Sequence, residues 1–275
     1  MQLSVDIRND FTPSEDLIRE IAADLRTGLF GEGVMEPENV EISLSFVTPE
    51  EIRTLNRDYR DKDEETDVLS FPADEEAPDI YLLGDIVIST DRAAEQAREI
   101  GHGLDEEIRY LAIHSLFHLL GYDHMDDESK RIMREREKET LALRKRIDTL
   151  AERALEAKTH AYIPYSHFHV GAALETEDGE IFTGANIENA SYGVTRCAEQ
   201  VAMLKMAYEG ARRVRILAVT GDADYTYPCG VCRQMLREFA DEDTVIAIVN
   251  DRCDFRLHTL DEILPYSFGP EDLDV

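Results

Sequence analysis

The stretch TRCAEQVAMLKMAYEG, residues 195–210, and its counterpart YPCGVCRQMLREF, residues 227–239, decide the fold of the second half of the chain. Each places cysteine at the expected first turn of a helix, so Cys197, Cys229 and Cys232 can converge. Unpaired backbone N–H groups at a helix N-terminus favour the thiolate, which is the form that binds zinc. Three protein ligands leave the fourth tetrahedral position open, as in catalytic rather than structural zinc sites. The sequence therefore predicts a catalytic zinc ion held by three thiolates.

Glu199 lies two residues after Cys197, near the predicted metal but not obliged to bind it. Zinc deaminases use such a glutamate to carry a proton from the activated water to the ring nitrogen and the departing ammonia. Their pattern is His or Cys, one residue, Glu, and later Pro-Cys-x-x-Cys, which matches Cys197-Ala198-Glu199 and residues 228–232. A closed, structural zinc site would need a fourth Cys or His nearby. We therefore expect Glu199 to be catalytic.

Strand and helix patterns alternate around these two motifs, which predicts an α/β layered sheet. A DG turn joins the first two expected strands. The strands are expected at HVGAALET (169–176), EIFTGANI (180–187), RILAVTG (215–221) and TVIAIVN (244–250), with helices from about Thr195 and from about Gly230.

The stretches AYIPYSHFHVGAAL, GANIENASYGVTRCAEQ, PCGVCRQMLREF and LPYSFGPEDL resemble the cytidine deaminase family across nearly all of residues 150–275. The resemblance implies a three-layer α/β fold, and cytidine or deoxycytidine as the substrate that is hydrolysed to the uracil nucleoside and ammonia. It also implies a homo-oligomer, a tetramer formed through this domain. The residues it implies at the substrate are Asn186 and Glu188 on the ribose hydroxyls, Phe168 against the pyrimidine, Ala198 through its backbone N–H, and Phe268 at a neighbouring site.

The pair Asn186 and Glu188 offers an amide and a carboxylate, which suit a sugar diol and not a phosphate. This favours a free nucleoside, and the alternative is deamination of a base within nucleic acid. Many members of the family carry Arg at the position of Gln200, so relief of the negative charge of three thiolates falls to neutral hydrogen bonds or to Arg196. The histidines that flank the Phe in HFH, residues 167–169, are interpreted as surface variation.

The first half contains HSLFHLLGYDH, in which His114 and His118 stand four residues apart on one helical face. His124 follows Gly121, which is well placed to end the helix, so three imidazoles can face one ion. This spacing is that of the metzincin proteases, but Ser115 stands where their catalytic Glu belongs. The pattern therefore predicts a metal site and excludes a metzincin peptidase.

Together with LNRDYRDKDEETDVLSFP and LLGDIVIST, this stretch resembles the YbeY family of endoribonucleases and rRNA maturation factors across residues 1 to about 145. That family has HGxLHLxGYDH, so Ser115 and Phe117 replace a usual Gly and Leu. The resemblance implies an α+β metal-hydrolase-like domain whose partner is rRNA or a ribosomal subunit. It implies a second Zn²⁺ on the three histidines and Arg60 as the basic residue needed for cleavage of single-stranded RNA.

Arg60 beside a hydrolytic metal could clamp a phosphodiester and stabilise the charge of the transition state. The alternative for this residue is an ordinary surface ion pair with Asp61 or Asp63. The alternative for the whole domain is a ribosome-associated factor that is not catalytic and whose metal is structural.

The first half mixes strands and helices irregularly, which indicates an α+β domain. TPSE at 12–15 offers Thr12 as the N-cap of a helix that runs to about Leu29. Strands are also expected at 3–8 and at VEISLSFV (40–47), and those at 68–71 and 80–89 are expected to pair with each other. TPEE at 48–51 repeats the capping pattern of TPSE and starts a second helix, and another helix runs from near Asp105 to Gly121. From Asp126 to about Lys158 we expect one long helix or two broken near Ile147, with the domain boundary inside this segment.

The chain of 275 residues has a formal charge of −30, and its length suits two domains, which we place at 1–145 and 146–275. The first carries 17 basic and 36 acidic groups, a net −19 that repels phosphate, so RNA must meet a local basic patch. An acidic surface also keeps a protein soluble in a salty cytosol. No stretch approaches the roughly 18 apolar residues of a membrane span, and we expect no membrane partner and a cytoplasmic protein with reduced thiols.

Overall fold

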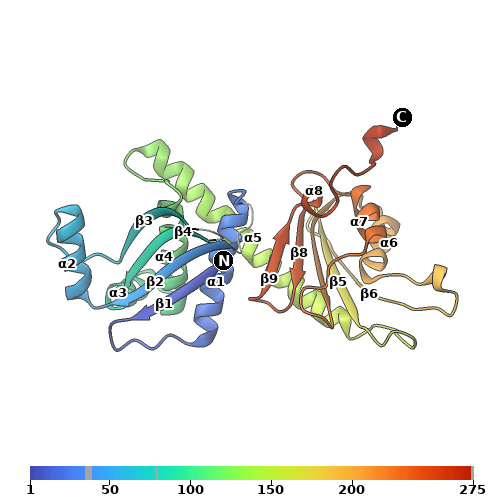
Figure 1. Ribbon diagram of the computed structural model, residues 1–275, viewed down its shortest axis with the longest axis horizontal. Coiled ribbons are helices and arrows are strands. Elements are labelled where there is room, and N and C mark those ends of the chain that lie inside the picture. The colour runs from blue at the N-terminus through green and yellow to red at the C-terminus, as the bar shows by residue number, and fades with distance from the viewer. Residues whose placement is uncertain (35–38, 78–79, 274–275) are drawn as a thin grey trace. The chain divides into compact units, whose positions relative to one another are not determined.

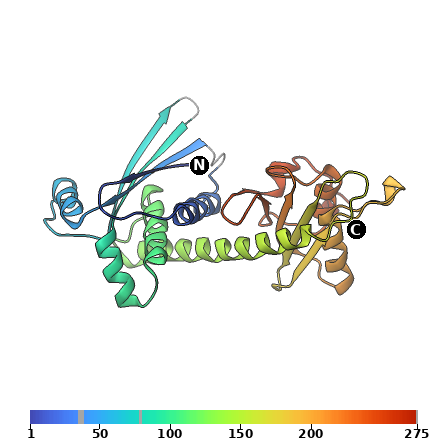
Figure 2. The ribbon, with the colours of Figure 1, turned by 90° about the horizontal axis from the view of Figure 1, so that it is seen from below.

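The computed structural model describes residues 1–34, 39–77 and 80–273 (Figure 1). The chain divides into two compact units, Met1–Arg144 and Lys145–Val275. Helix α5, Asp127–Lys158, belongs to both, and Figure 2 shows it as one uninterrupted helix. Of the two alternatives, one long helix or two broken near Ile147, the first is confirmed, because the segment holds no Gly or Pro to interrupt the backbone ladder.

The first unit is built on a four-stranded mixed sheet of order β1-β2-β4-β3. Strand β2 lies parallel to both β1 and β4. Strand β3 pairs with β4 in the antiparallel direction, so the predicted pairing of these two strands is confirmed. The elements are β1 (Gln2–Ile7), α1 (Glu15–Gly31), β2 (Val40–Val47), α2 (Pro49–Arg60), β3 (Val68–Ala77), β4 (Ile80–Ser89), α3 (Thr90–Ile100) and α4 (Leu104–Leu119).

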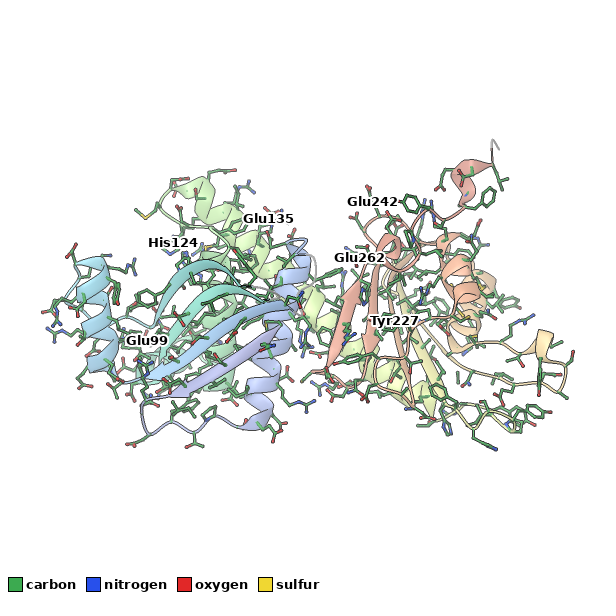
Figure 3. The ribbon with its side chains drawn as sticks, in the orientation of Figure 1. Glu99, His124, Glu135, Tyr227, Glu242 and Glu262 are labelled. Atoms are coloured by element: carbon green, nitrogen blue, oxygen red, sulfur yellow. The ribbon has the colours of Figure 1, made fainter. Side chains whose placement is uncertain are left out.

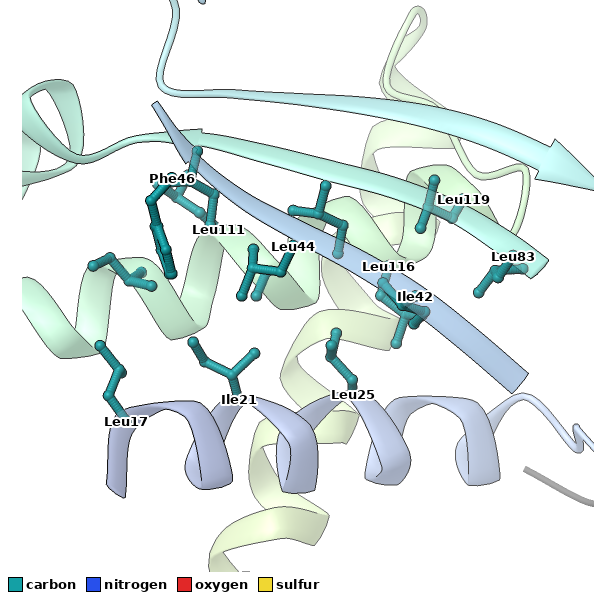
Figure 4. Packing of buried hydrophobic residues seen from close by; sticks show 14 of the residues in the cluster. Leu17, Ile21, Leu25, Ile42, Leu44, Phe46, Leu83, Leu111, Leu116 and Leu119 are labelled. Carbon is teal, nitrogen blue, oxygen red and sulfur yellow. The ribbon is translucent and has the colours of Figure 1, made fainter. Parts of the chain in front are cut away.

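The core of this unit lies between the sheet and the helices α1 and α4 (Figure 4). The core residues of α1 and α4 recur every one or two turns, and those of β2 recur at every second position. These spacings place side chains on one face of a helix or of a strand. The α+β class predicted for this half is confirmed. The labelled core residues include Leu17, Ile21 and Leu25 of α1, Ile42, Leu44 and Phe46 of β2, and Leu111, Leu116 and Leu119 of α4.

Two helix starts test the capping predictions. At α2, Thr48 accepts a hydrogen bond from the Glu51 backbone N–H and the Glu51 carboxylate accepts one from Thr48, so the predicted capping box is confirmed. At α1 the prediction of Thr12 as N-cap is wrong. Ser14 is the cap instead, because its hydroxyl accepts from the Leu17 backbone N–H, three residues on. Helix α3 was not predicted.

The second unit contains a five-stranded mixed sheet of order β6-β5-β7-β8-β9. Strands β7 and β8 are parallel, and the remaining neighbours are antiparallel. Strand β9 and helix α8 were not predicted. The elements are β5 (Val170–Thr176), β6 (Ile181–Ala185), α6 (Ala198–Glu209), β7 (Val214–Gly221), α7 (Gly230–Arg237), β8 (Val245–Val249), β9 (Phe255–His258) and α8 (Leu260–Ile263).

Two glycines let helices approach this sheet from opposite faces. A Cβ on Gly171 of β5 would lie 2.1 Å from the Ala154 carbonyl oxygen of α5, and one on Gly184 of β6 would lie 2.2 Å from the Ala198 carbonyl oxygen of α6. Gly184 pairs with Ala172, the neighbour of Gly171, so the two glycines face opposite sides of the sheet. The predicted three-layer α/β arrangement is confirmed, and α6 is held close where its N-terminus carries Cys197.

Candidate metal centres

His114, His118 and His124 gather in the first unit with one ligand atom of each within 4.8 Å of the others. The first two lie on α4, and His124 comes from the segment between α4 and α5 (Figure 3). Gly121 has φ 90°, a left-handed conformation that glycine adopts without strain and that turns the chain back toward the helix. The structure therefore brings together the three histidines that the sequence singled out.

The hydrogen bonds of two rings fix where their lone pairs point. The Nδ1 of His118 lies 2.9 Å from the Tyr122 carbonyl oxygen, which can only accept, so Nδ1 carries the hydrogen. The Nδ1 of His114 lies 2.7 Å from a carboxylate oxygen of Glu137 and is a donor for the same reason. Both Nε2 atoms are thus left as acceptors, and they face each other at 3.2 Å.

Two acceptors at that distance repel each other unless a cation lies between them. Tetrahedral zinc with Zn–N bonds of about 2.0–2.1 Å separates its nitrogen ligands by roughly 3.3 Å, close to the 3.2 Å between the two Nε2 atoms. Burial, and then the neighbouring His114, lowers the pKa of His118, so its neutral form is favoured. The donor set fits zinc.

Glu137 is a residue of this site that the sequence analysis missed. It lies on α5, it is 4% exposed, and its second carboxylate oxygen is 3.3 Å from the Tyr110 hydroxyl, which donates to it. Burial, and then the charge of Glu137, raises the pKa of Tyr110 to about 12, so the hydroxyl keeps its hydrogen. One buried carboxylate thus orients His114 and is itself held by a tyrosine.

Arg60, the last residue of α2, lines the same cleft as the three histidines, with a volume of about 560 Å³. Asp63 is engaged by Arg53, whose guanidinium holds it at 2.8 and 3.0 Å and lowers its pKa. Within the described part of the chain, no ion pair is formed by Arg60. The alternative of an ordinary surface ion pair with Asp61 or Asp63 is therefore wrong, and Arg60 faces the cleft.

Ser115 is completely buried in α4, and its hydroxyl has no hydrogen-bond partner among the described residues. It points away from the cleft that holds its neighbour His114. A side chain in this position cannot act on a substrate, which agrees with the exclusion of a metzincin peptidase.

Three cysteine thiols gather in the second unit, again within 4.8 Å of one another. Cys197 and Cys229 are the N-cap residues of α6 and α7, both with extended backbone. Helix α6 begins at Ala198 rather than at about Thr195, so Cys197 precedes the first turn instead of lying within it. The Sγ atoms of Cys197 and Cys229 are 3.9 Å apart, and those of Cys229 and Cys232 are 3.5 Å apart. Tetrahedral zinc with Zn–S bonds of about 2.3 Å separates sulfur ligands by roughly 3.8 Å, so this donor set also fits zinc.

The thiols of this cluster are electrostatically distinct. A hydrogen bond from Cys232 lowers the pKa of Cys197 to about 7, and the charge of Arg196 contributes in the same direction. The hydrogen bond to Cys197 and then burial raise the pKa of Cys232. The guanidinium of Arg196 donates to the backbone oxygens of Gly193 and Thr195, which keeps its charge near the cluster. Arg196 therefore supplies part of the compensation that Gln200 cannot.

Glu199 is 3% exposed and lies beside the cysteines. Burial raises the pKa of its carboxyl, although a hydrogen bond from the Cys232 thiol acts in the opposite direction. A carboxyl whose pKa is raised holds a proton more readily, so it can both accept a proton and deliver it near neutral pH. Ala198, the first residue of α6, is fully buried between Cys197 and Glu199.

The residues expected to bind substrate are tied to one segment. The Asn186 amide donates to the Phe168 carbonyl at 2.8 Å and accepts from the Val170 backbone N–H at 2.9 Å. The Glu188 carboxylate accepts from the backbone N–H groups of residues 165 and 166. The Ser166 hydroxyl, and then these N–H groups, lower the pKa of Glu188. Asn186 and Glu188 thus shape the segment that carries Phe168. Phe268, the remaining expected residue, is 59% exposed.

The interpretation of the HFH histidines as surface variation is incomplete. The backbone N–H and ring Nδ1 of His169 both contact one Asp222 oxygen at 2.7 Å. Lys158, the last residue of α5, lies 2.9 Å from the other Asp222 oxygen. These contacts hold the pKa of Asp222 well below its usual range. His169 therefore anchors the chain directly after Phe168.

Comparisons with known proteins match the two halves separately. The family profile described as Endoribonuclease YbeY matches residues 10–145, and the profile described as Cytidine and deoxycytidylate deaminase zinc-binding region matches residues 144–248. An endoribonuclease YbeY of Finegoldia magna is 51% identical over 135 residues, 49% of this chain and 87% of its own length. A cytidine deaminase of Halalkalibacterium halodurans is 46% identical over 125 residues, 45% of this chain and 95% of its own length.

Among solved structures, the cytidine deaminase from Burkholderia pseudomallei is similar, with 40% sequence identity and a TM-score of 0.42. The match covers 44% of this chain and 97% of that one. Within the described residues, no helix is both long enough and apolar enough to span a membrane.

Proposed function

The chain belongs to the YbeY endoribonuclease family through its first half and to the cytidine deaminase family through its second, and we propose that it works as a bifunctional zinc hydrolase. The chain covers 87% and 95% of the length of the two relatives named above, so each half is large enough to carry its family's activity. The two clusters of three metal-binding side chains are the observation that supports the proposal.

In the second unit, we assign Cys197, Cys229 and Cys232 as the zinc ligands. Zinc, when bound there, supplies a Lewis acid that makes water a nucleophile near neutral pH. Glu199 would accept one proton from the attacking water and pass it to the pyrimidine ring nitrogen. It would then transfer a second proton, from the hydroxyl newly bonded to C4, to the amino group, which leaves as ammonia when the C–N bond breaks. Its burial supports this role, because the protonated carboxyl is stabilised between the two transfers.

Four further residues position cytidine or deoxycytidine. The Ala198 backbone N–H, at the start of α6, is oriented toward an acceptor on the base. Asn186 and Glu188 bind the sugar hydroxyls with the hydrogen-bonding capacity that the segment around Phe168 leaves free, and Phe168 packs against the base. A carboxylate at this position opposes a phosphate, which favours a free nucleoside over a base within nucleic acid.

Glu199→Gln tests this assignment, because the amide keeps the shape of the side chain and cannot carry the proton. We expect ammonia release from cytidine to fall by at least ~10²-fold, the scale of general acid–base catalysis, while zinc stays bound. Glu209→Gln, the same substitution at the exposed last residue of α6, is the matched control and should leave ammonia release unchanged. Release of ammonia from single-stranded oligonucleotides, and none from cytidine, would favour the alternative substrate.

In the first unit, we assign His114, His118 and His124 as the zinc ligands of a single-strand endoribonuclease in rRNA maturation. Arg60 binds the non-bridging oxygens of the phosphodiester and stabilises the negative charge of the transition state. Its freedom from carboxylate partners in the described structure supports this role, since nearby Arg53 is already neutralised by Asp63. Glu137 keeps His114 in the tautomer that presents Nε2 to the metal.

Arg60→Ala tests this half in the full chain, with Arg53→Ala on the same helix as the control. We expect the former to lower kcat for cleavage of single-stranded RNA by ~10²-fold or more and the latter to leave it unchanged. A chain that sustains rRNA maturation after all three histidines are replaced would instead favour a ribosome-associated factor with a structural metal.

We also propose the domain limits 1–145 and 146–275, a cytoplasmic location and a homotetramer formed through the second unit, in which Phe268 reaches a neighbouring site. The exposure of Phe268 supports a role in contacts outside its own unit, and free thiols suit a reducing compartment. Sedimentation of the full chain and of Phe268→Ala measures the assembly.

A further inference from the structure

Two cavities meet at the three-histidine centre. His114 and His124 line both the Arg60 cleft and a second cavity of about 230 Å³. The second cavity is bounded by the first turns of α5, and its remaining lining residues are Tyr110, Lys130, Met133, Arg134 and Glu137. The candidate metal centre is therefore open on two sides, with Arg60 on one side and Lys130 and Arg134 on the other.

Lys130 and Arg134 lie one turn apart on α5 and are both exposed. Within the described residues, no carboxylate is within ion-pair distance of either side chain. Their neighbours on the same helix differ, because Arg131 pairs with Glu128 and Glu135, and Arg136 with Glu32 and Glu139. In this acidic unit, the two basic residues of α5 that face the cavity keep their charge uncompensated.

The one acid that lines the second cavity, Glu137, offsets only part of the charge of Lys130 and Arg134. One oxygen of Glu137 is engaged by His114 and the other by the Tyr110 hydroxyl, and its side chain is 5% exposed. Lys130 and Arg134 line this cavity together with His114 and His124. An anion in this cavity would thus meet Lys130 and Arg134.

We propose that Lys130 and Arg134 form a second phosphate-binding site, which holds the RNA backbone next to the phosphodiester that is cleaved. The strand enters through the Arg60 cleft, crosses His114 and His124, and leaves over the first turns of α5. This inference rests on the proposed endoribonuclease function and specifies its substrate as a single strand that extends on both sides of the scissile bond.

The arrangement answers the electrostatic difficulty of this unit. A net charge of −19 over residues 1–145, from 17 basic and 36 acidic groups, repels a polyanion at long range. Basic side chains without acidic partners on each side of the reacting phosphate provide the local attraction that binding needs. Grooves that follow a single strand use positive charge in the same way.

The test is a double variant, Lys130→Ala with Arg134→Ala, in the full zinc-loaded chain. Its control is Lys138→Ala with Arg98→Ala, which removes the same charge from two exposed residues that line neither cavity. The probe is a labelled single-stranded RNA oligonucleotide. Both its affinity and the kcat and KM of its cleavage are measured between about 50 and 200 mM salt, the range over which phosphate contacts lose strength.

The slope of log affinity against log salt is negative, and each lost phosphate contact makes it shallower by about 0.7 for a single strand. The double variant should therefore make it shallower by about 1.4. Over a fourfold salt range this equals about a 7-fold smaller loss of affinity than in the wild type. KM should rise with kcat nearly unchanged, because uniform binding is removed. The charge-conserving Lys130→Arg with Arg134→Lys should restore the wild-type slope, which a merely misfolded protein would not do.

A double variant with the slope and KM of its control overturns the inference while cleavage by the wild type leaves the endoribonuclease function intact. If the wild type binds the RNA without cleaving it, the proposed endoribonuclease function is wrong. The salt dependence of binding then still shows whether Lys130 and Arg134 contact phosphate. A wild type that neither binds nor cleaves the RNA overturns both.

Discussion

Replacement of Glu137 by alanine should weaken zinc at the three-histidine centre without touching a ligand. The substitution removes the carboxylate oxygen that lies 2.7 Å from His114 Nδ1 and leaves that N–H without its acceptor. The ring is then free to rotate or to exchange tautomers, and the Nε2 lone pair is no longer fixed toward His118.

Two general magnitudes set the size of this effect. Loss of an outer hydrogen-bond partner of a metal ligand lowers affinity by about 10–100-fold, or about 1.4–2.7 kcal/mol. A hydrogen bond to a charged group contributes about 1.5–3 kcal/mol. The His114 side chain is 22% exposed and that of Glu137 5%, so water can replace the carboxylate only in part. We expect a loss of about 30-fold, near the middle of the range.

Competition with a chromophoric chelator measures the zinc affinity of both centres in one full-length protein. The three-cysteine centre serves as an internal reference, since it should not change. Glu139→Ala is the matched control, because this glutamate lies on the same helix but is exposed and bonded to Arg136. An affinity equal to that of the control, or a parallel loss at both centres, would refute the reasoning.

Three further changes probe other parts of the structure. Gly184→Ala should lower the free energy of unfolding by about 1–3 kcal/mol, because its Cβ would meet the backbone of α6, whereas Gly193→Ala, in open space, should not; thermal melting compares them. Thr48→Ala should cost about 1 kcal/mol through loss of the capping box, measured by urea unfolding. The pKa of Asp222 is lowered in the folded protein, so Asp222→Asn should be less stable than the wild type above pH about 4, the pKa of an unfolded aspartate. The difference in the free energy of unfolding should shrink as the pH falls further, and a difference that persists at low pH would contradict this.

The metal-binding side chains could be predicted from the sequence because their geometry is local. His114 and His118 share a helical face through their spacing, and Gly121 ends the helix so that His124 can return. The cysteine pair at 229 and 232 opens a helix for a similar reason. The three histidines thus come from one short segment, whereas Cys197 meets the other two cysteines only where the N-termini of α6 and α7 come together.

The residues that hold these donors were not predictable in the same way. Glu137 reaches His114 from α5, where it is one acid among many in a charged helix, and no pattern distinguishes it from its exposed neighbours Glu135 and Glu139. The same holds for the contact of Asp222 with His169, which depends on the end of a strand far along the chain. Long-range packing selects these partners.

Local rules also failed where two residues competed for one role. TPSE contains two possible caps, and Ser14 prevails over Thr12 because its hydroxyl, not that of Thr12, reaches the N–H of the third helical residue. Arg60 shows the opposite case. Its sequence neighbours offer carboxylates, but Arg53 takes Asp63, and Arg60 is left facing the cleft.

Metal analysis of the full chain tests the central claim most directly, combined with both activity assays on the wild type and on His118→Ala and Cys229→Ser. We expect two zinc ions per chain, one for each cluster of donors. His118→Ala should lose one ion and RNA cleavage while keeping cytidine deamination, and Cys229→Ser should show the reverse. A single zinc ion in the wild type, or loss of both ions and both activities in either variant, would contradict it.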